Sequence, residues 1–144
     1  MPSPTFSLSS ADQLLSKFVT TYAYEFNDEN APPQSSFNPP PPPFSGPLAF
    51  PLGAYHTAEL QYLFTGQFFD LPVAPLSPVQ QLSNAMISYR TQFAKTGDPN
   101  SSGEPIWTPY SAIADKFQSL IPPAPMVESN FNAGHQCSTL WDKF

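Results

Sequence analysis

The sequence predicts a mixed α/β fold in which short regular elements are separated by long irregular stretches. An alternating aromatic pattern over residues 19–26 predicts a strand, and apolar residues at steps of three and four over 76–95 predict a helix. Twenty prolines among 144 residues predict the irregular stretches, because proline lacks an amide donor and interrupts helices and inner strands. The chain length is that of one domain.

The N-terminus and the first helix are separated by a change of pattern near residue 10. Residues 1–10 have neither helical nor strand spacing, and we expect a loose N-terminus there. Ser10 and Gln13 have the spacing of a capping box, and Leu14 follows at a helical interval. These signals predict a short helix over 11–18.

The predicted strand leads into the most proline-rich part of the chain. Aromatic residues on both faces of 19–26 favour a position inside a larger sheet, and turn residues at 27–30 end the strand. A loop is predicted over 31–51, where five consecutive prolines at 39–43 favour an extended polyproline conformation. This loop is either a plain surface connection or a docking site for a proline-recognising partner.

The helix over 76–95 has well-marked boundaries. Ser77 is a suitable N-cap, and Pro78 suits the first helical position. Gly97 ends the helix. Shorter patterns predict a helix over 57–65, a brief strand over 117–121 and a closing amphipathic helix over 134–143.

Composition argues against several partners and cofactors. The net charge is −6, and Lys and Arg are scattered along the chain, so we expect no nucleic-acid partner. No apolar run approaches the length of a membrane span, and the N-terminus lacks the basic and apolar regions of a signal peptide. The compartment is left open. We expect neither a metal nor a cofactor.

Cysteine and aromatic content predict the state of the thiol and how much apolar surface the chain exposes. Cys137 is the only cysteine, which excludes an internal disulfide and a cysteine-based zinc site, and we expect a buried thiol. Aromatic residues make up 15% of the chain and charged residues only 11%. The isolated chain is therefore expected to expose apolar surface, as a piece of something larger would.

Two histidines are the candidates for acid–base chemistry. His56 follows the turn-forming Gly53 and precedes the helical spacing of 57–65, so its imidazole is expected to project from a loop. A general-base histidine needs such a position, with one ring nitrogen facing the nucleophile and the other held by a carboxylate. A structural histidine, hydrogen-bonded in a loop, is the alternative. His135 lies in a polar run, and we expect it to face solvent.

The segment GAYHTAELQYLF, residues 53–64, resembles the histidine segment of the type-B carboxylesterases and cholinesterase-like esterases. Other segments resemble the same family in the same order: VTTYAYEF, SNAMISYRTQFAKTGDPN, IWTPY and CSTLWDKF. The resemblance covers residues 11–144. It implies an incomplete, C-terminal segment of an α/β-hydrolase fold, with one or two strands, about four helices and long proline-rich loops.

The resemblance also implies a serine-esterase triad in which His56 is the general base. In such enzymes a serine on a G-x-S-x-G turn attacks the ester carbonyl, and the chain order is serine, acid, histidine. This sequence contains no G-x-S-x-G and no HGGG-like oxyanion element. We therefore expect the nucleophile and the triad acid upstream, and we expect this chain alone to be inactive.

Glu59 is the acidic residue nearest in sequence to the histidine, three residues after it. The resemblance implies a supporting carboxylate at this offset, with the triad acid contributed from upstream. A carboxylate at the start of the helix over 57–65 is also favoured by the helix dipole. Direct orientation of His56 by Glu59 is the alternative.

Two functions are consistent with these observations. In the first, the chain is the C-terminal segment of a serine carboxylesterase that acts on a carboxylic ester, and its partner is the missing N-terminal portion or a second copy of itself. In the second, the chain is a non-enzymatic interaction protein, or one half of a split esterase, that acts through an exposed aromatic surface.

Overall fold

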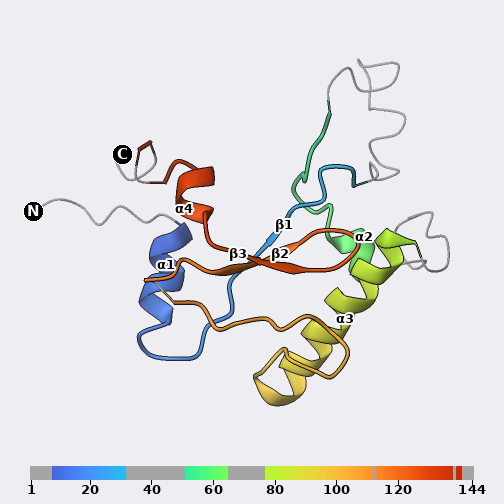
Figure 1. The fold of residues 1–144 in the computed structure, drawn as a ribbon, viewed down its shortest axis with the longest axis horizontal. Coiled ribbons are helices and arrows are strands. Elements are labelled where there is room, and N and C mark those ends of the chain that lie inside the picture. Colours follow the sequence, from blue (N-terminus) through green and yellow to red (C-terminus); the bar gives the residue numbers. More distant parts are fainter. Residues whose placement is uncertain (1–7, 32–50, 65–76, 112, 138, 141–144) are drawn as a thin grey trace, which may run out of the picture. The chain divides into compact units, whose positions relative to one another are not determined.

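The computed structural model describes residues 8–31, 51–64, 77–111, 113–137 and 139–140. These contain helices and strands in the order α1 (Leu8–Leu15), β1 (Tyr24–Phe26), α2 (Leu60–Leu63), α3 (Pro78–Thr96), β2 (Phe117–Leu120), β3 (Met126–Glu128) and α4 (Phe131–Gly134) (Figure 1). Residues 1–7 of the predicted loose N-terminus and residues 32–50 of the predicted proline-rich loop lie outside the described residues, whereas residues 8–10 belong to α1. The chain divides into two units: unit 1 is Met1–Glu25, Ile106–Ser119 and Met126–Phe144, and unit 2 is Phe26–Pro105 and Leu120–Pro125.

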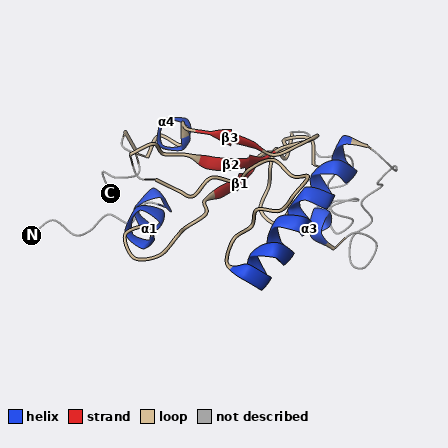
Figure 2. Cartoon of the chain, turned by 60° about the horizontal axis from the view of Figure 1, so that its bottom comes forward, coloured by secondary structure: helices blue, strands red, loops and turns tan. Residues whose placement is uncertain are grey.

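The strands form one sheet in the order β1-β2-β3, with β2 in the middle (Figure 2). β2 and β3 are antiparallel, and Gln118 pairs with Val127. The amide of Gln118 donates to the Ala23 carbonyl at 2.9 Å, and the amide of Asn27 donates to the Leu120 carbonyl at 3.0 Å. Both bonds advance in the same direction along the two strands, which is the pattern of a parallel pair.

Unit 2 is built on α2 and α3, which contact each other. The side chain of Ser77 accepts a hydrogen bond from the Gln80 amide at 3.2 Å, and Gly97 ends α3 in the left-handed region at φ 77°. Both predicted caps are thus confirmed. The apolar stripe of α3 packs into the core of unit 2, whose buried members are Ala31, Ala58, Tyr62, Leu82, Met86 and Leu120.

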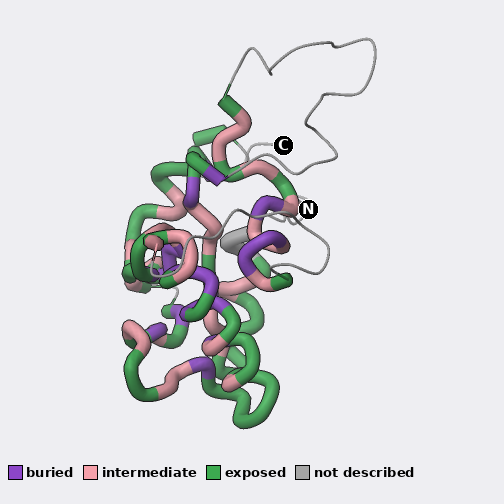
Figure 3. Tube along the Cα trace, turned by 90° about the vertical axis from the view of Figure 1, so that its right-hand side faces the viewer, coloured by how far each residue is buried: buried purple, intermediate pink, exposed green. Residues whose placement is uncertain are grey.

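Unit 1 has a smaller core beside the sheet. Ala23, Tyr110 and Phe117 are buried, and the partly buried Phe131 of α4 packs against them. The rings of Phe117 and Phe131 meet edge to face, with centroids 5.4 Å apart. Cys137 is buried, as predicted. Along both units buried positions alternate with exposed ones over short stretches (Figure 3).

The first helix lies further upstream than predicted. The sequence predicted 11–18, whereas α1 spans Leu8–Leu15, so Ser10 lies inside the helix and is not its N-cap. The helix ends where the hydroxyl of Ser16 donates to the carbonyl of Gln13 at 3.1 Å. Such a local side-chain bond competes with the backbone for the acceptors of the last turn.

The strand predicted over 19–26 is regular only in its last three residues. Upstream of β1 the chain also bonds to segments that are not strands, since the Thr21 carbonyl accepts from the Tyr110 amide at 2.8 Å. The Ala23 carbonyl also accepts from the Trp107 indole at 3.0 Å. The prediction was therefore correct that this segment forms hydrogen bonds to neighbouring segments. It was wrong about the length of the strand, because some of those neighbours are not strands.

Two predicted helices are shorter than their apolar spacing indicated. The prediction over 57–65 is confirmed only for α2, because Thr57 lies in the left-handed region at φ 72° and cannot begin an α-helix. The described part of the prediction over 134–143 is not helical beyond Gly134, where α4 ends, and Gln136 has φ 55°. Residues 138 and 141–143 of this prediction lie outside the described residues. The described residues contain three strands, whereas one or two were predicted. β2 was predicted, whereas β3 was not.

None of the helices in the described part of the chain is long and apolar enough to cross a membrane.

We predict that Leu82→Ala lowers the free energy of unfolding by about 2–5 kcal/mol, because it leaves a cavity in the core of unit 2. Leu82 is fully buried on α3, whereas Ile87 on the same helix is exposed. Ile87→Ala is therefore the matched control, with an expected loss below about 1 kcal/mol. Urea unfolding followed by circular dichroism measures both values, and equal losses would contradict the core assignment.

Candidate functional site

His56 lies in a turn immediately before α2, and its side chain is exposed. Within the described part of the chain, no hydrogen bond or ion pair occupies its imidazole. Both ring nitrogens are thus open to groups that come from outside the described residues. This is the projecting position that the sequence predicted, and it differs from that of a histidine fixed in a loop.

The backbone around His56 takes two conformations that most residues avoid. Gly53 has φ 62° and Thr57 has φ 72°. The left-handed region is easy for glycine, but a β-branched residue there is an outlier with an energetic cost of about 1–3 kcal/mol. Such strain persists only where surrounding contacts determine the conformation. We therefore expect contacts of the following residues to hold this backbone in place.

Tyr62 is the anchor of the segment that follows the histidine. Its side chain is fully buried, and its hydroxyl donates to Oδ2 of Asp28 at 2.5 Å. Burial, and after it the hydrogen bond to Asp28, raise the pKa of Tyr62 above its ordinary value. The phenol therefore keeps its proton and remains a donor. The Tyr62 carbonyl accepts from the Ser83 hydroxyl at 2.5 Å, which ties α2 to α3.

A second contact closes the turn around His56. The side-chain amide of Gln61 donates to the Tyr55 hydroxyl at 2.8 Å, and the Ala58 amide donates to the Tyr55 carbonyl at 3.0 Å. These bonds join the residue before the histidine to residues after it. The sequence did not identify Asp28, Tyr62 or Gln61 as part of the site. Asp28 in particular lies in a segment whose only sequence signal was that of a turn.

Glu59 occupies the N-cap position of α2 and is half-buried, but its side chain makes no capping hydrogen bond. Among the described residues, no hydrogen bond or ion pair joins Glu59 to His56. Its place at the start of the helix matches the prediction. The geometry does not bring its carboxylate to the imidazole.

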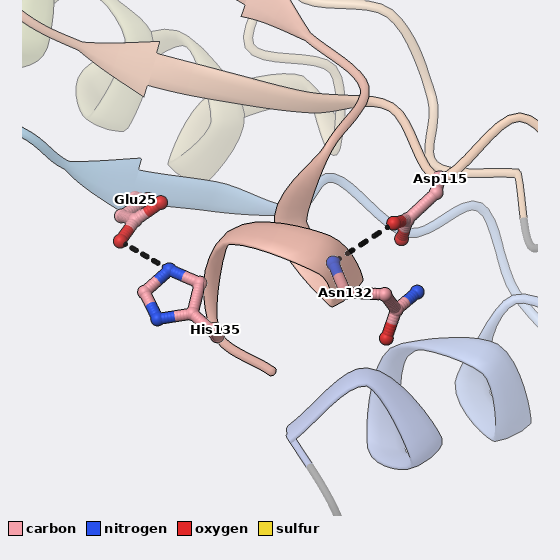
Figure 4. Close-up of polar contacts among 4 residues, drawn as sticks. All are labelled: Glu25, Asp115, Asn132 and His135. Atoms are coloured by element: carbon pink, nitrogen blue, oxygen red, sulfur yellow. Dashed lines mark hydrogen bonds and ion pairs between the residues drawn. The ribbon is translucent and has the colours of Figure 1, made fainter. Parts of the chain in front are cut away.

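His135, the second histidine, has a structural contact in unit 1 (Figure 4). Its Nε2 lies 2.7 Å from Oε1 of Glu25, and 46% of its side chain is exposed. Its ring packs on Phe131 with centroids 4.3 Å apart. At the other end of α4, Asp115 Oδ2 accepts from the Asn132 amide at 3.1 Å. His135 is exposed as predicted, and it holds α4 against β1.

The described residues contain no group of three or more His, Cys, Asp or Glu side chains placed to hold a metal ion. What the described residues present at this site is an exposed imidazole on a turn that the contacts of Tyr55, Gln61 and Tyr62 hold. An imidazole in this position can take a proton from an alcohol and return it to a leaving group.

The fold is that of an α/β-hydrolase. A carboxylesterase of Geobacillus stearothermophilus matches 88% of this chain and 23% of its own, with a TM-score of 0.56 at 22% identity. A thermophilic pNB esterase matches 85% of this chain and 22% of its own, with a TM-score of 0.52 at 22% identity. The carboxylesterase family profile matches residues 4–138, so the chain belongs to the carboxylesterase family.

The chain is also similar in sequence to a lipase and to another carboxylesterase. The bile salt-activated lipase of Bos taurus is 38% identical over 85 residues, which is 54% of this chain and 14% of the lipase. Carboxylesterase 5A of Felis catus is 33% identical over 94 residues, which is 62% of this chain and 15% of the cat protein. The matched segments therefore span about a seventh of the length of these relatives.

We predict that Thr57→Gly is more stable than Thr57→Val by about 1 kcal/mol, because only glycine enters the left-handed region without strain. Both variants lose the threonine hydroxyl, so the comparison isolates the backbone conformation. Urea unfolding measures the difference. A Val variant as stable as the Gly variant would show that position 57 does not have a positive φ.

Proposed function

We propose that this chain is the C-terminal segment of a serine carboxylesterase and that His56 is its general base. Membership of the carboxylesterase family over residues 4–138 is the observation that carries the proposal. The exposed imidazole of His56, on a turn that buried contacts fix, supports it. The nucleophilic serine, the triad acid and the oxyanion donors come from polypeptide upstream of this sequence.

In this mechanism His56 moves one proton in each half of the reaction. The serine hydroxyl attacks the ester carbonyl while His56 accepts its proton, and the imidazolium then protonates the departing alcohol. Water attacks the resulting acyl-serine while His56 again accepts a proton, and the acid product leaves as the serine is reprotonated. Glu59, half-buried at the start of α2, contributes a nearby negative charge without direct contact.

The sequence itself supports the need for further polypeptide. It contains no G-x-S-x-G turn, and its matches cover only about a seventh of these relatives. Oxyanion donors and the nucleophile together account for most of the rate of such enzymes. An imidazole without them is only a weak catalyst of ester hydrolysis.

We therefore predict that the purified chain hydrolyses p-nitrophenyl butyrate no faster than free imidazole at the same concentration. The reason is that this chain supplies neither nucleophile nor oxyanion donors. Initial rates of p-nitrophenol release measure this, with His56→Ala as the control. Turnover well above that of free imidazole that His56→Ala abolishes would contradict the proposal, because the chain would then carry a complete active site.

The positive test joins this chain to the missing portion. In a hybrid, the chain replaces the matching segment of the bovine bile salt-activated lipase, its 38% identical relative. His56→Ala should then lower kcat for p-nitrophenyl butyrate by at least about 10³-fold, because a triad member is lost.

His135→Ala is the matched control in the same hybrid. His135 is the only other histidine of the chain, and an exposed substitution of this kind should change kcat by no more than about threefold. Equal losses in the two variants, or an active hybrid that retains its activity in His56→Ala, would overturn the role of His56.

A second function is favoured by the apolar surface of unit 1. Phe18 is 78% exposed and Ile113 is 99% exposed, which is unusual for large apolar side chains. In this alternative the chain is an interaction protein, or one half of a split esterase, that binds a partner through this surface. A hybrid in which His56→Ala has no effect, together with dimers of the chain by sedimentation, would favour it.

A further inference from the structure

The direction in which His56 points is set by the residues that follow it. Thr57 has φ 72°, a conformation that a β-branched residue adopts only when it is held there. Ala58 and Tyr62 are fully buried in the core of unit 2. The turn therefore joins an exposed imidazole to a buried anchor within six residues, and any shift of the anchor reaches the turn.

Asp28 holds the anchor from a different part of the chain. Its side chain is buried, at 5% exposure. One carboxylate oxygen accepts from the Tyr62 hydroxyl at 2.5 Å, and the other accepts from the Asn30 amide at 2.9 Å. Both oxygens thus have partners. A charge-assisted bond of this length is among the stronger hydrogen bonds in proteins.

The ring and the main chain of Tyr62 are fixed as well. The Phe26 ring meets the Tyr62 ring with centroids 5.1 Å apart, and Ser83 donates to the Tyr62 carbonyl. The side-chain amide of Gln61 donates to the Tyr55 hydroxyl at 2.8 Å, across the turn that contains His56. The Tyr62 hydroxyl is the one group of this anchor that can be removed without changing the packing of its ring.

We propose that Asp28 and Tyr62 are positioning residues for His56: their buried hydrogen bond holds Thr57 in its left-handed conformation and thereby fixes the direction of the imidazole. The inference rests on the proposed function, because the direction of the imidazole affects catalysis only if His56 is the general base. Its test measures backbone and ring geometry, so that it can fail separately from the esterase proposal.

The experiment uses the full 144-residue chain, isotopically labelled for NMR. In Tyr62→Phe the three-bond couplings about φ of Thr57 should lose their positive-φ values, and the ring signals of His56 should shift toward those of an unstructured histidine. In Asp28→Asn both sets of signals should stay near wild type. An Asn side chain can accept from the Asn30 amide with its oxygen and donate to the Tyr62 oxygen with its nitrogen.

Tyr89→Phe is the matched control for a general loss of stability. Tyr89 is likewise buried in unit 2, and its hydroxyl donates at 2.5 Å to the Pro105 carbonyl. Its removal should leave the signals of Thr57 and His56 unchanged. If Tyr62→Phe leaves Thr57 at positive φ, or if Tyr89→Phe disturbs it equally, the positioning role is overturned.

A further measurement applies if Tyr62→Phe does not fold. In the unaltered chain the Tyr62 hydroxyl proton should exchange with water slowly enough to be seen as a downfield resonance, and Asp28→Ala should abolish it. A Tyr62 hydroxyl that exchanges as fast as that of an exposed tyrosine overturns the proposal. Failure of the hybrid esterase to need His56, by contrast, would leave these spectra unchanged and would overturn only the catalytic role.

Discussion

The hydrogen bond between Tyr62 and Asp28 is the interaction on which the arrangement of unit 2 depends. It joins the segment after β1 to α2, and the Ser83 bond joins α2 to α3. α2 has only four residues, so it is too short to be stable without tertiary contacts. Because these contacts lie immediately after His56, the same bonds that form the core also determine where the exposed imidazole is mounted.

The two histidines show how the environment of a side chain limits what it can do. Nε2 of His135 lies 2.7 Å from Oε1 of Glu25, and the imidazole ring packs on Phe131. Both contacts attach α4 to its neighbours. His56 has no such contact among the described residues, although the residue that follows it, Thr57, has φ 72°. A fixed backbone with an uncommitted ring is what a general base requires, and this contrast cannot be derived from the sequence around either residue.

The sequence was most informative where one segment carries its own signals. α3 was predicted because its apolar stripe, its Ser77 cap and its Gly97 stop all lie within it. Elements defined by distant partners were predicted poorly: β3 has only three residues and becomes a strand by pairing with β2. The same reason hid Asp28, because its partner Tyr62 is 34 residues away. Family resemblance singled out His56 as the proposed base, but it could not predict the contacts that hold its turn.

The two units differ in the size of their cores and in how many buried polar groups lack hydrogen bonds. Among the described residues, the core of unit 2 contains six buried residues and that of unit 1 contains three. In unit 1 both side-chain polar atoms of Gln118 are buried without a hydrogen-bond partner in the described part of the chain, and each such group costs about 1–3 kcal/mol. Phe18 and Ile113 expose large apolar surface in the same unit. Unit 1 is therefore the part that gains most from contact with further polypeptide, whereas unit 2 already fixes the turn of the proposed base.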